Sequence, residues 1–471
     1  MAVVVITGGG VVGLSTAMLL ARDGHLVTVL ERDPNPPPPP LDAWDDWSRR
    51  GVTQFRLPHF LLARFHAEMA RELPEVVEGL LAAGAFRLNP IEVMPTSASG
   101  GWRPGDERFT AVTGRRPLVE SVVAGVAEAH PGVTVRRDVA VTGLLTAAPA
   151  APGAPHVVGV TTSGGDRIPA DLVVDAMGRR SPSPSLLAPA GGPAPGEEVE
   201  EIGFVYYGRH FAGPDGAPPP MIGPPVQECG SVTVLTLPAD NGTWSVTVVT
   251  SARDPALRTL SDPQRWAAVV GLMPLAAHWL DGTPLDDRVA IMAKLEDRRR
   301  RFAPGGVPVV TGLVPVGDAW ACTNPSLGRG ASIGLVHAVA LRDHLRTGDL
   351  DDPAGFAARW SALTDEAVGP WYEVSLHIDR HRLAEIHAEI DGAPRPAVDA
   401  RYEARKQLEL AGSQDPDLLR ANFDSGLVLR TADDVMAEAG VAARAAELGA
   451  DWRDQPRLGP TRSELLAAAH G

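Results

Sequence analysis

The chain has 471 residues, a formal net charge of -15 and two cysteines, Cys229 and Cys322. Its length is sufficient for two domains with full hydrophobic cores, so folding needs neither disulfides nor structural metals. The acidic balance argues against nucleic-acid binding, which requires clustered cations. The two cysteines lie far apart and have no metal-ligand spacing, which indicates buried small side chains in a reduced intracellular protein.

The first residues, MAVVVITGGG, predict a βαβ unit at the N-terminus. Residues 3–7 form an apolar strand pattern, residues 14–24 an apolar helix and residues 25–31 a second strand. The start carries no basic segment of the kind that opens a signal peptide, and no apolar run reaches membrane-spanning length. We therefore expect a cytoplasmic protein without a membrane span.

The following segments predict loops, strands and helices in separate blocks. Five consecutive prolines at residues 36–40 predict an extended loop. Strand patterns occupy residues 133–147, 156–178, 203–211, 230–238 and 243–251, with a loop over 214–225. Helical patterns occupy residues 60–83 with a break at Pro74, residues 117–129, residues 334–346 and most of the chain from residue 353.

A glycine motif follows the first strand. Gly8, Gly10 and Gly13 open the first helix, and Glu31 ends the second strand. This spacing provides a tight turn, room for a pyrophosphate, a helix N-terminus facing the phosphates and a carboxylate for the ribose. We interpret it as a dinucleotide-binding fingerprint, the alternative being a structural glycine turn. Glu31 argues against a 2'-phosphate here, but the fingerprint does not separate NAD from FAD.

Two later segments separate these cofactors. They are LVVDAMGRRS at residues 172–181 and PVGDAWACTNPSLGRG at residues 315–330. Together with the N-terminal glycines, they resemble the FAD-dependent monooxygenase superfamily related to aromatic-ring hydroxylases, and the resemblance extends to about Arg346. The segments RRGVTQFRLPHFLL, GRRPLVESVV and WYEVSLHIDRHR further resemble an actinobacterial subgroup that includes polyether epoxidases.

The resemblance implies an α/β fold: a Rossmann-type FAD-binding domain, an interleaved antiparallel β-sheet substrate domain and C-terminal helices. The FAD-binding domain would comprise residues 1–180 and 300–346, the substrate domain residues 181–299 with parts of 85–115, and the helical region residues 347–471. The residues implied for cofactor binding are Gly8, Gly10, Val12, Gly13, Glu31, Arg32, Arg50, Arg116, Asp318, Pro325, Gly328, Gly330 and Ala331.

Each part of FAD has residues implied for it by the resemblance. The glycine turn and Glu31 would hold the adenylate half, and Arg116 would reach the phosphate or ribityl region. Asp318 would bond a ribityl hydroxyl, and residues 325–330 would run beside the isoalloxazine ring, where backbone NH groups stabilise reduced flavin. Arg50 would be either a flavin contact or a loop anchor.

The implied activity is that of an FAD monooxygenase with an apolar small-molecule substrate, which is hydroxylated or epoxidised with one atom of O2 through a flavin C4a-hydroperoxide. No second complete GxGxxG is present, so the electron source is either NAD(P)H directly or a flavin reductase partner. We predict no catalytic base and no metal. The alternatives are a related FAD-dependent reductase or oxidase without oxygen insertion, and a non-catalytic flavin-binding protein.

Several further residues have a functional and a structural interpretation. The candidate substrate contacts are His59, Tyr207, Arg209 and Trp320. For each of these the alternative is packing, because strand residues alternate between two faces and aromatic residues commonly pack. We expect the arginine run at residues 298–301 to form a solvated face. Packing and a salt bridge are the roles expected of Trp371, Tyr372, Asp379 and Arg380.

Overall fold

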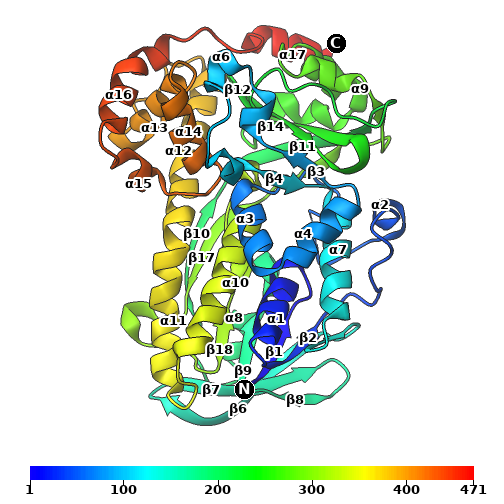
Figure 1. The fold of residues 1–471 in the computed structure, drawn as a ribbon, viewed down its shortest axis with the longest axis vertical. Helices are drawn as coiled ribbons and strands as arrows, with labels where there is room; N and C mark the ends of the chain where they lie inside the picture. Colours follow the sequence, from blue (N-terminus) through cyan, green and yellow to red (C-terminus); the bar gives the residue numbers. More distant parts are fainter. Residues whose placement is uncertain (53) are drawn as a thin grey trace.

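The computed structural model describes residues 1–52 and 54–471 and is elongated (Figure 1). Its lower part in Figure 1 is built on a parallel sheet with the strand order β18-β9-β1-β2-β5. The strands are β1 (Val3–Thr7), β2 (Leu26–Leu30), β5 (Val133–Arg136), β9 (Leu172–Asp175) and β18 (Leu313–Pro315). The apolar runs of β1 and β9 are almost entirely buried, as expected of strands that are covered on both faces.

Different layers cover the two faces of the parallel sheet. Val4 and Ile6 of β1 pack with three helices, whereas Val5 packs with an antiparallel three-stranded sheet. The helices are α1 (Val11–Arg22), α7 (Arg116–Ala129) and α10 (Gly330–Thr347). The strands of the covering sheet are β6 (Val141–Ala151), β7 (Ala154–Thr162) and β8 (Arg167–Pro169). The expected βαβ unit and the strands that follow it are thus confirmed.

The upper part is built on an antiparallel sheet with the order β12-β13-β14-β11-β15, and β16 also pairs with β11. Its strands are β11 (Phe204–Ala212), β12 (Val226–Cys229), β13 (Val232–Pro238), β14 (Thr243–Ser251), β15 (Thr283–Pro284) and β16 (Ala290–Met292). Helices α9 (Pro263–Gly271) and α17 (Arg462–His470) cover one face, around the buried Trp244, Trp266 and Trp279. The expected strands in this region are confirmed.

A further sheet of three strands corrects the interpretation of the arginine run. Strand β17 (Glu296–Arg301) lies between β10 (Gly196–Glu201) and β19 (Ala321–Cys322). Arg299 and Arg300 are buried and pair with Glu198 and Glu197 of β10. The prediction of a solvated face is therefore wrong, because a strand of glutamates about a hundred residues earlier lies opposite the arginines. Strand β17 also runs through the expected domain boundary at residue 300, and the domain division stays a prediction.

The remaining elements are mainly helices. Helix α3 (Ala63–Glu72) ends just before Pro74 and α4 (Pro74–Ala82) begins on it, which confirms the expected break. The C-terminal helices are α11 (Pro353–Ala367), α12 (Gly369–Asp391), α13 (Ala400–Ala411), α14 (Pro416–Gly426), α15 (Ala432–Met436) and α16 (Val441–Leu448). The short elements are α2 (Ala43–Asp46), β3 (Phe86–Leu88), α5 (Pro90–Val93), α6 (Thr96–Ser99), β4 (Ala111–Thr113) and α8 (Ser183–Leu187). In the described part of the chain, every helix is too short or too polar to cross a lipid bilayer.

Candidate active site

The turn between β1 and α1 has the shape of a phosphate cradle. A Cβ on Gly8, whose φ is +103°, would lie 2.5 Å from the Ala176 carbonyl oxygen, and a Cβ on Gly13 would lie 2.1 Å from the Gly8 oxygen. Gly10 is different, because no described atom lies within 4 Å of its Cβ position. No side chain caps α1, and its first turn holds no acidic residue. The free amide groups of α1 therefore face open space that fits an anionic group.

Glu31 stands at the far side of this turn in a buried network of charges. Its carboxylate accepts hydrogen bonds from the Gly9 amide at 2.8 Å and the Asp33 amide at 2.9 Å. Arg49 forms ion pairs with Glu31, Asp33 and Glu120, and its side chain is only 3% exposed. Arg49 and Glu120 were not predicted from the sequence.

The other predicted residues of this region lie differently. Arg32 and Arg50 are exposed, and Val12 packs against α10, where a Cβ on Gly334 would lie 2.5 Å from Val12 Cγ2. The structure thus brings Arg49, and not its neighbour Arg50, to Glu31. A buried carboxylate signals the need for a counter-ion, but the sequence does not say which of two adjacent arginines turns inward.

Arg116 and His59 continue this network toward the upper sheet. Arg116 pairs with Glu120 and donates a hydrogen bond to His59 Nε2 at 3.1 Å, while His59 Nδ1 donates to the Leu57 carbonyl at 3.0 Å. Burial and the neighbouring Arg116 lower the pKa of His59 to about 4. His59 is therefore a neutral imidazole at neutral pH.

The segment around His59 lies between β11 and the predicted flavin loop. A Cβ on Gly208 of β11 would lie 3.1 Å from Pro58, and a Cβ on Gly328 would lie 3.5 Å from the Phe60 carbonyl oxygen. His59 is therefore the one of the four predicted substrate contacts that the structure places between these two elements.

Asp318 lies at the start of the second glycine segment, on a 3-10 turn (Gly317–Ala319) after β18. Among residues 1–52 and 54–471 its carboxylate has no hydrogen-bond partner, although it is half-buried. Burial raises the pKa of Asp318, against the lowering effect of Arg179, Arg116 and Arg298. A Cβ on Gly330, the first residue of α10, would lie 3.9 Å from Asp318 Oδ1. The unbonded carboxylate beside an uncapped helix start fits a hydroxyl-bearing chain such as the ribityl group.

A buried histidine that the sequence analysis did not identify holds this turn. His337 of α10 accepts a hydrogen bond from the Gly317 amide at Nδ1, at 3.1 Å, and bonds Thr364 Oγ1 through Nε2 at 3.0 Å. Gly317 has a φ of +57°, which favours glycine. Trp320, a predicted substrate contact, packs edge-on to His337 with ring centroids 5.5 Å apart, in a cluster with Leu62. Trp320 thus packs beside the turn, and its predicted substrate contact stays a prediction.

Asn324 fixes the loop that begins at Pro325. Its amide donates to Asp297 Oδ1 at 2.8 Å, and its Nδ2 donates to Asp379 Oδ1 at 2.7 Å. Its side-chain oxygen accepts hydrogen bonds from the Tyr206 hydroxyl and from the Ser326 amide. The loop then turns through Gly328, which has a φ of +66°, into the uncapped start of α10 at Gly330 and Ala331.

The two carboxylates at Asn324 are unusual. Burial raises the pKa of Asp297 to about 6, and burial and Asp297 raise the pKa of Asp379 well above its ordinary value. Asp379 Oδ2 has no hydrogen-bond partner within the described residues. Asp379 and Arg380 were expected to pack and to form a salt bridge. Of these two, only Arg380 forms an ion pair, with Glu200. A cavity of about 230 Å³ reaches Asp297 and Asp379 from the outside.

The two faces of β11 have different surroundings. Tyr206, Gly208 and His210 face the site, through contacts with Asn324, Pro58 and Trp44 respectively. Tyr207 belongs to the cluster under α9, and Arg209 lies 5.7 Å from the centre of the Trp266 ring on that same side. The structure therefore does not bring the predicted Tyr207 and Arg209 to the loop, because side chains alternate along a strand.

A basic cavity of about 480 Å³ is lined in part by Arg179 and Arg298, whose charges also act on Asp318. Besides the carboxylate of Glu296, its lining contains Arg179, Arg180, Lys294 and Arg298, none of which forms an ion pair with a carboxylate in the described part of the chain. Arg179 instead donates to the Glu296 and Thr323 carbonyl oxygens. Four unpaired cations around one cavity favour an anionic ligand.

Comparisons with known proteins agree with this architecture. Residues 3–38 match the family model described as FAD dependent oxidoreductase. The chain is 29% identical over 421 residues to Protein Rv3254 of Mycobacterium tuberculosis (strain ATCC 25618 / H37Rv), a match that covers 83% of this chain and 82% of the relative. PqsL of Pseudomonas aeruginosa, described as a probable FAD-dependent monooxygenase, has a TM-score of 0.55 and 18% identity, covering 82% of this chain and 99% of PqsL. The Diels-Alderase PyrE3 of the pyrroindomycin pathway has a TM-score of 0.54 and 19% identity, covering 90% of this chain and 80% of PyrE3.

The nucleotide-binding unit thus carries the signature of the FAD-dependent oxidoreductases, and the whole chain has the fold of FAD-dependent monooxygenases. The protein is an FAD-dependent oxidoreductase, as its motifs predicted. The fold alone does not select the reaction, because a monooxygenase and a Diels-Alderase share it. The polyether epoxidase subgroup stays a prediction.

Proposed function

We propose that the protein is an FAD-dependent monooxygenase that inserts one oxygen atom from O2 into an apolar small molecule, by hydroxylation or epoxidation. The observation that supports it most is the half-buried Asp318, which has no hydrogen-bond partner in the described residues and lies beside the uncapped start of α10. Bound FAD would supply the redox chemistry and the activation of O2. Gly8, Gly10, Gly13, Asp318 and residues 325–330 would hold it.

The residues of the chain would position the substrate and exclude water. Tyr206 of β11 bonds Asn324 at the start of the predicted flavin loop, and His210, on the same face of the strand, packs against Trp44. The neutral His59 bonds Arg116. Burial lowers the pKa of His210 to about 3, so both histidines are uncharged at neutral pH. Uncharged side chains near the predicted isoalloxazine site suit an apolar substrate and a reaction from which water is excluded.

The electron source is part of the proposal. The cavity with Arg179, Arg180, Lys294 and Arg298 supports direct docking of an anionic reductant such as NAD(P)H, instead of delivery by a flavin reductase. Anaerobic mixing with NADH or NADPH should bleach the flavin, and the double variant Arg180→Met with Lys294→Met should slow this step about tenfold or more. If the wild type and the double variant are reduced at equal rates, the cavity has no part in flavin reduction. If the flavin is reduced only when a separate reductase is present, that reductase replaces NAD(P)H as the direct electron source in the proposal.

Oxygen uptake tests the reaction type. With aromatic, indolic and polyene compounds as candidate substrates, a monooxygenase consumes O2 and reductant in equal amounts and releases little hydrogen peroxide. Asn324→Ala should raise the peroxide fraction, because Asn324 holds both the loop and Tyr206. Consumption that always ends in peroxide would instead support an oxidase.

A second candidate is a flavoprotein that does not insert oxygen. It is favoured by one observation, that PyrE3 shares this fold and is described as a Diels-Alderase. The two candidates differ in their need for O2. Product formation at an unchanged rate under anaerobic conditions would favour the second.

A further inference from the structure

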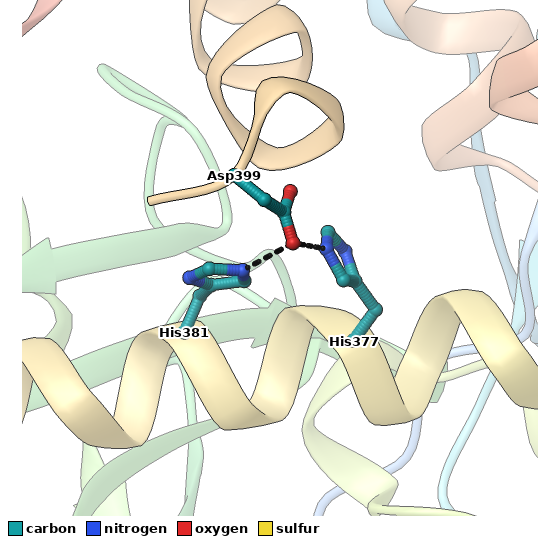
Figure 2. Close-up of side chains that lie close together, drawn as sticks. All are labelled: His377, His381 and Asp399. Atoms are coloured by element: carbon teal, nitrogen blue, oxygen red, sulfur yellow. Dashed lines mark hydrogen bonds and ion pairs between the residues drawn. The ribbon is translucent and has the colours of Figure 1, made fainter. Parts of the chain in front are cut away.

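Two histidines and an aspartate meet between α12 and α13 (Figure 2), and the histidines lie on the opposite face of α12 from Asp379. His377 and His381 lie one turn apart on α12, and Asp399 is the residue before α13. Asp399 Oδ2 lies 2.8 Å from His377 Nε2 and 3.1 Å from His381 Nε2. The nitrogen and oxygen atoms that could bind a metal all lie within 4.8 Å of one another.

This arrangement has the chemistry of a metal site. Residues at i and i+4 project from the same face of a helix, so both imidazoles reach one ion. Two histidines and one carboxylate are ligands suited to Zn²⁺, with bonds of about 2.0–2.1 Å that place neighbouring ligand atoms about 3.3 Å apart. The two His–Asp distances are already close to this value, and the two histidine nitrogens lie within 4.8 Å of one another.

The surroundings orient the three ligands. Asp399 Oδ1 accepts a hydrogen bond from the Tyr402 amide at 2.9 Å, so the carboxylate is held with Oδ2 toward the histidines. The His381 ring stacks on Tyr402 with centroids 4.3 Å apart. No arginine or lysine of the described residues forms an ion pair with Asp399, which leaves its charge to a cation. Such supporting contacts accompany metal-binding histidines and carboxylates.

We propose that His377, His381 and Asp399 bind one divalent transition-metal ion of the zinc class, which fastens α12 to α13. On binding, each Nε2 gives up its proton and the neutral ring carries its hydrogen on Nδ1 instead, while Asp399 stays ionised. Because Asp399 is half-exposed, a water molecule completes the tetrahedron. The proposal does not rest on the reaction proposed above.

Zinc binding to the untagged, full-length flavoprotein tests this site. After treatment with a chelator and dialysis, calorimetric titration with Zn²⁺ should show one equivalent bound, and the melting temperature should rise with Zn²⁺. His377→Ala and His381→Ala should each weaken binding at least tenfold and remove the shift. His470→Ala, a change at an exposed histidine elsewhere, should leave both unchanged.

One variant separates metal binding from folding. Asp399→Asn keeps an acceptor for the Tyr402 amide, since asparagine also caps helices, but removes the charged ligand. It should fold, retain its FAD and bind Zn²⁺ at least tenfold more weakly. The proposal is overturned if the wild-type protein binds no stoichiometric Zn²⁺, or if the histidine variants bind it as tightly as the wild type does.

Discussion

Substitution of Gly10 by valine separates cofactor binding from folding. Gly10 has extended backbone angles, with φ of -85° and ψ of -180°, which valine adopts without strain, and no described atom lies within 4 Å of its Cβ position. The free energy of unfolding of the apoprotein should therefore change by no more than about 1 kcal/mol. The valine methyl groups would instead occupy the space in front of the α1 amides. Loss of two hydrogen bonds to a pyrophosphate, each worth about 1.5–3 kcal/mol, raises the Kd for FAD roughly 10²–10⁴-fold.

Gly13→Val is the matched control. Its Cβ would lie 2.1 Å from the Gly8 oxygen, so the turn must move, at a cost of about 1–3 kcal/mol or more. The two variants are compared by three measurements: the ratio of flavin to protein absorbance, the Kd for FAD, and urea unfolding of the apoproteins. The Gly10→Val protein should bind FAD more weakly but keep its free energy of unfolding. The Gly13→Val protein should both bind FAD more weakly and have a lower free energy of unfolding. A Gly10→Val protein that retains stoichiometric FAD would refute the phosphate cradle.

Three other predictions concern buried polar groups. Arg49→Met leaves its carboxylate partners unpaired and should lower the free energy of unfolding, measured in urea, by about 3–5 kcal/mol. The exposed Arg50→Met should lower it by about 0.5 kcal/mol or less. Equal effects of the two substitutions would contradict the buried network. Tyr206→Phe should raise peroxide release during turnover, whereas Tyr207→Phe on the α9 face should not. For His59, the unfolded chain takes up a proton at about pH 6.5 and the folded protein only at about pH 4. The free energy of unfolding should therefore fall as the pH drops through this window, and fall less in His59→Asn; an identical pH dependence would show that His59 is solvated.

The sequence was sufficient wherever the signal is local. The glycines at positions 8, 10 and 13 follow a strand and open a helix within a few residues, so their roles can be predicted without tertiary structure. The break at Pro74 is local in the same sense, since the proline ring ends one helix and starts the next. The segments at Asp318 and Pro325 are predicted to contact FAD because their order of residues is itself distinctive, and this role stays a prediction.

Features that depend on partners distant in the sequence were missed. The arginines of β17 are buried because β10 brings glutamates opposite them. The choice between Tyr206 and Tyr207 depends on the register of β11 against β14 and on which sheet face the flavin domain covers. Asp379 is buried beside Asn324, a contact between residues 55 positions apart that no spacing rule indicates.

The most direct test of the proposed reaction is the fate of labelled oxygen. The FAD-loaded enzyme is supplied with NAD(P)H or a flavin reductase, a panel of aromatic, indolic and polyene compounds, and ¹⁸O2, and the products are analysed by mass spectrometry. The account predicts a product that carries one ¹⁸O atom, with the second atom in water. A product that forms without ¹⁸O, in an enzyme that turns over, would contradict it.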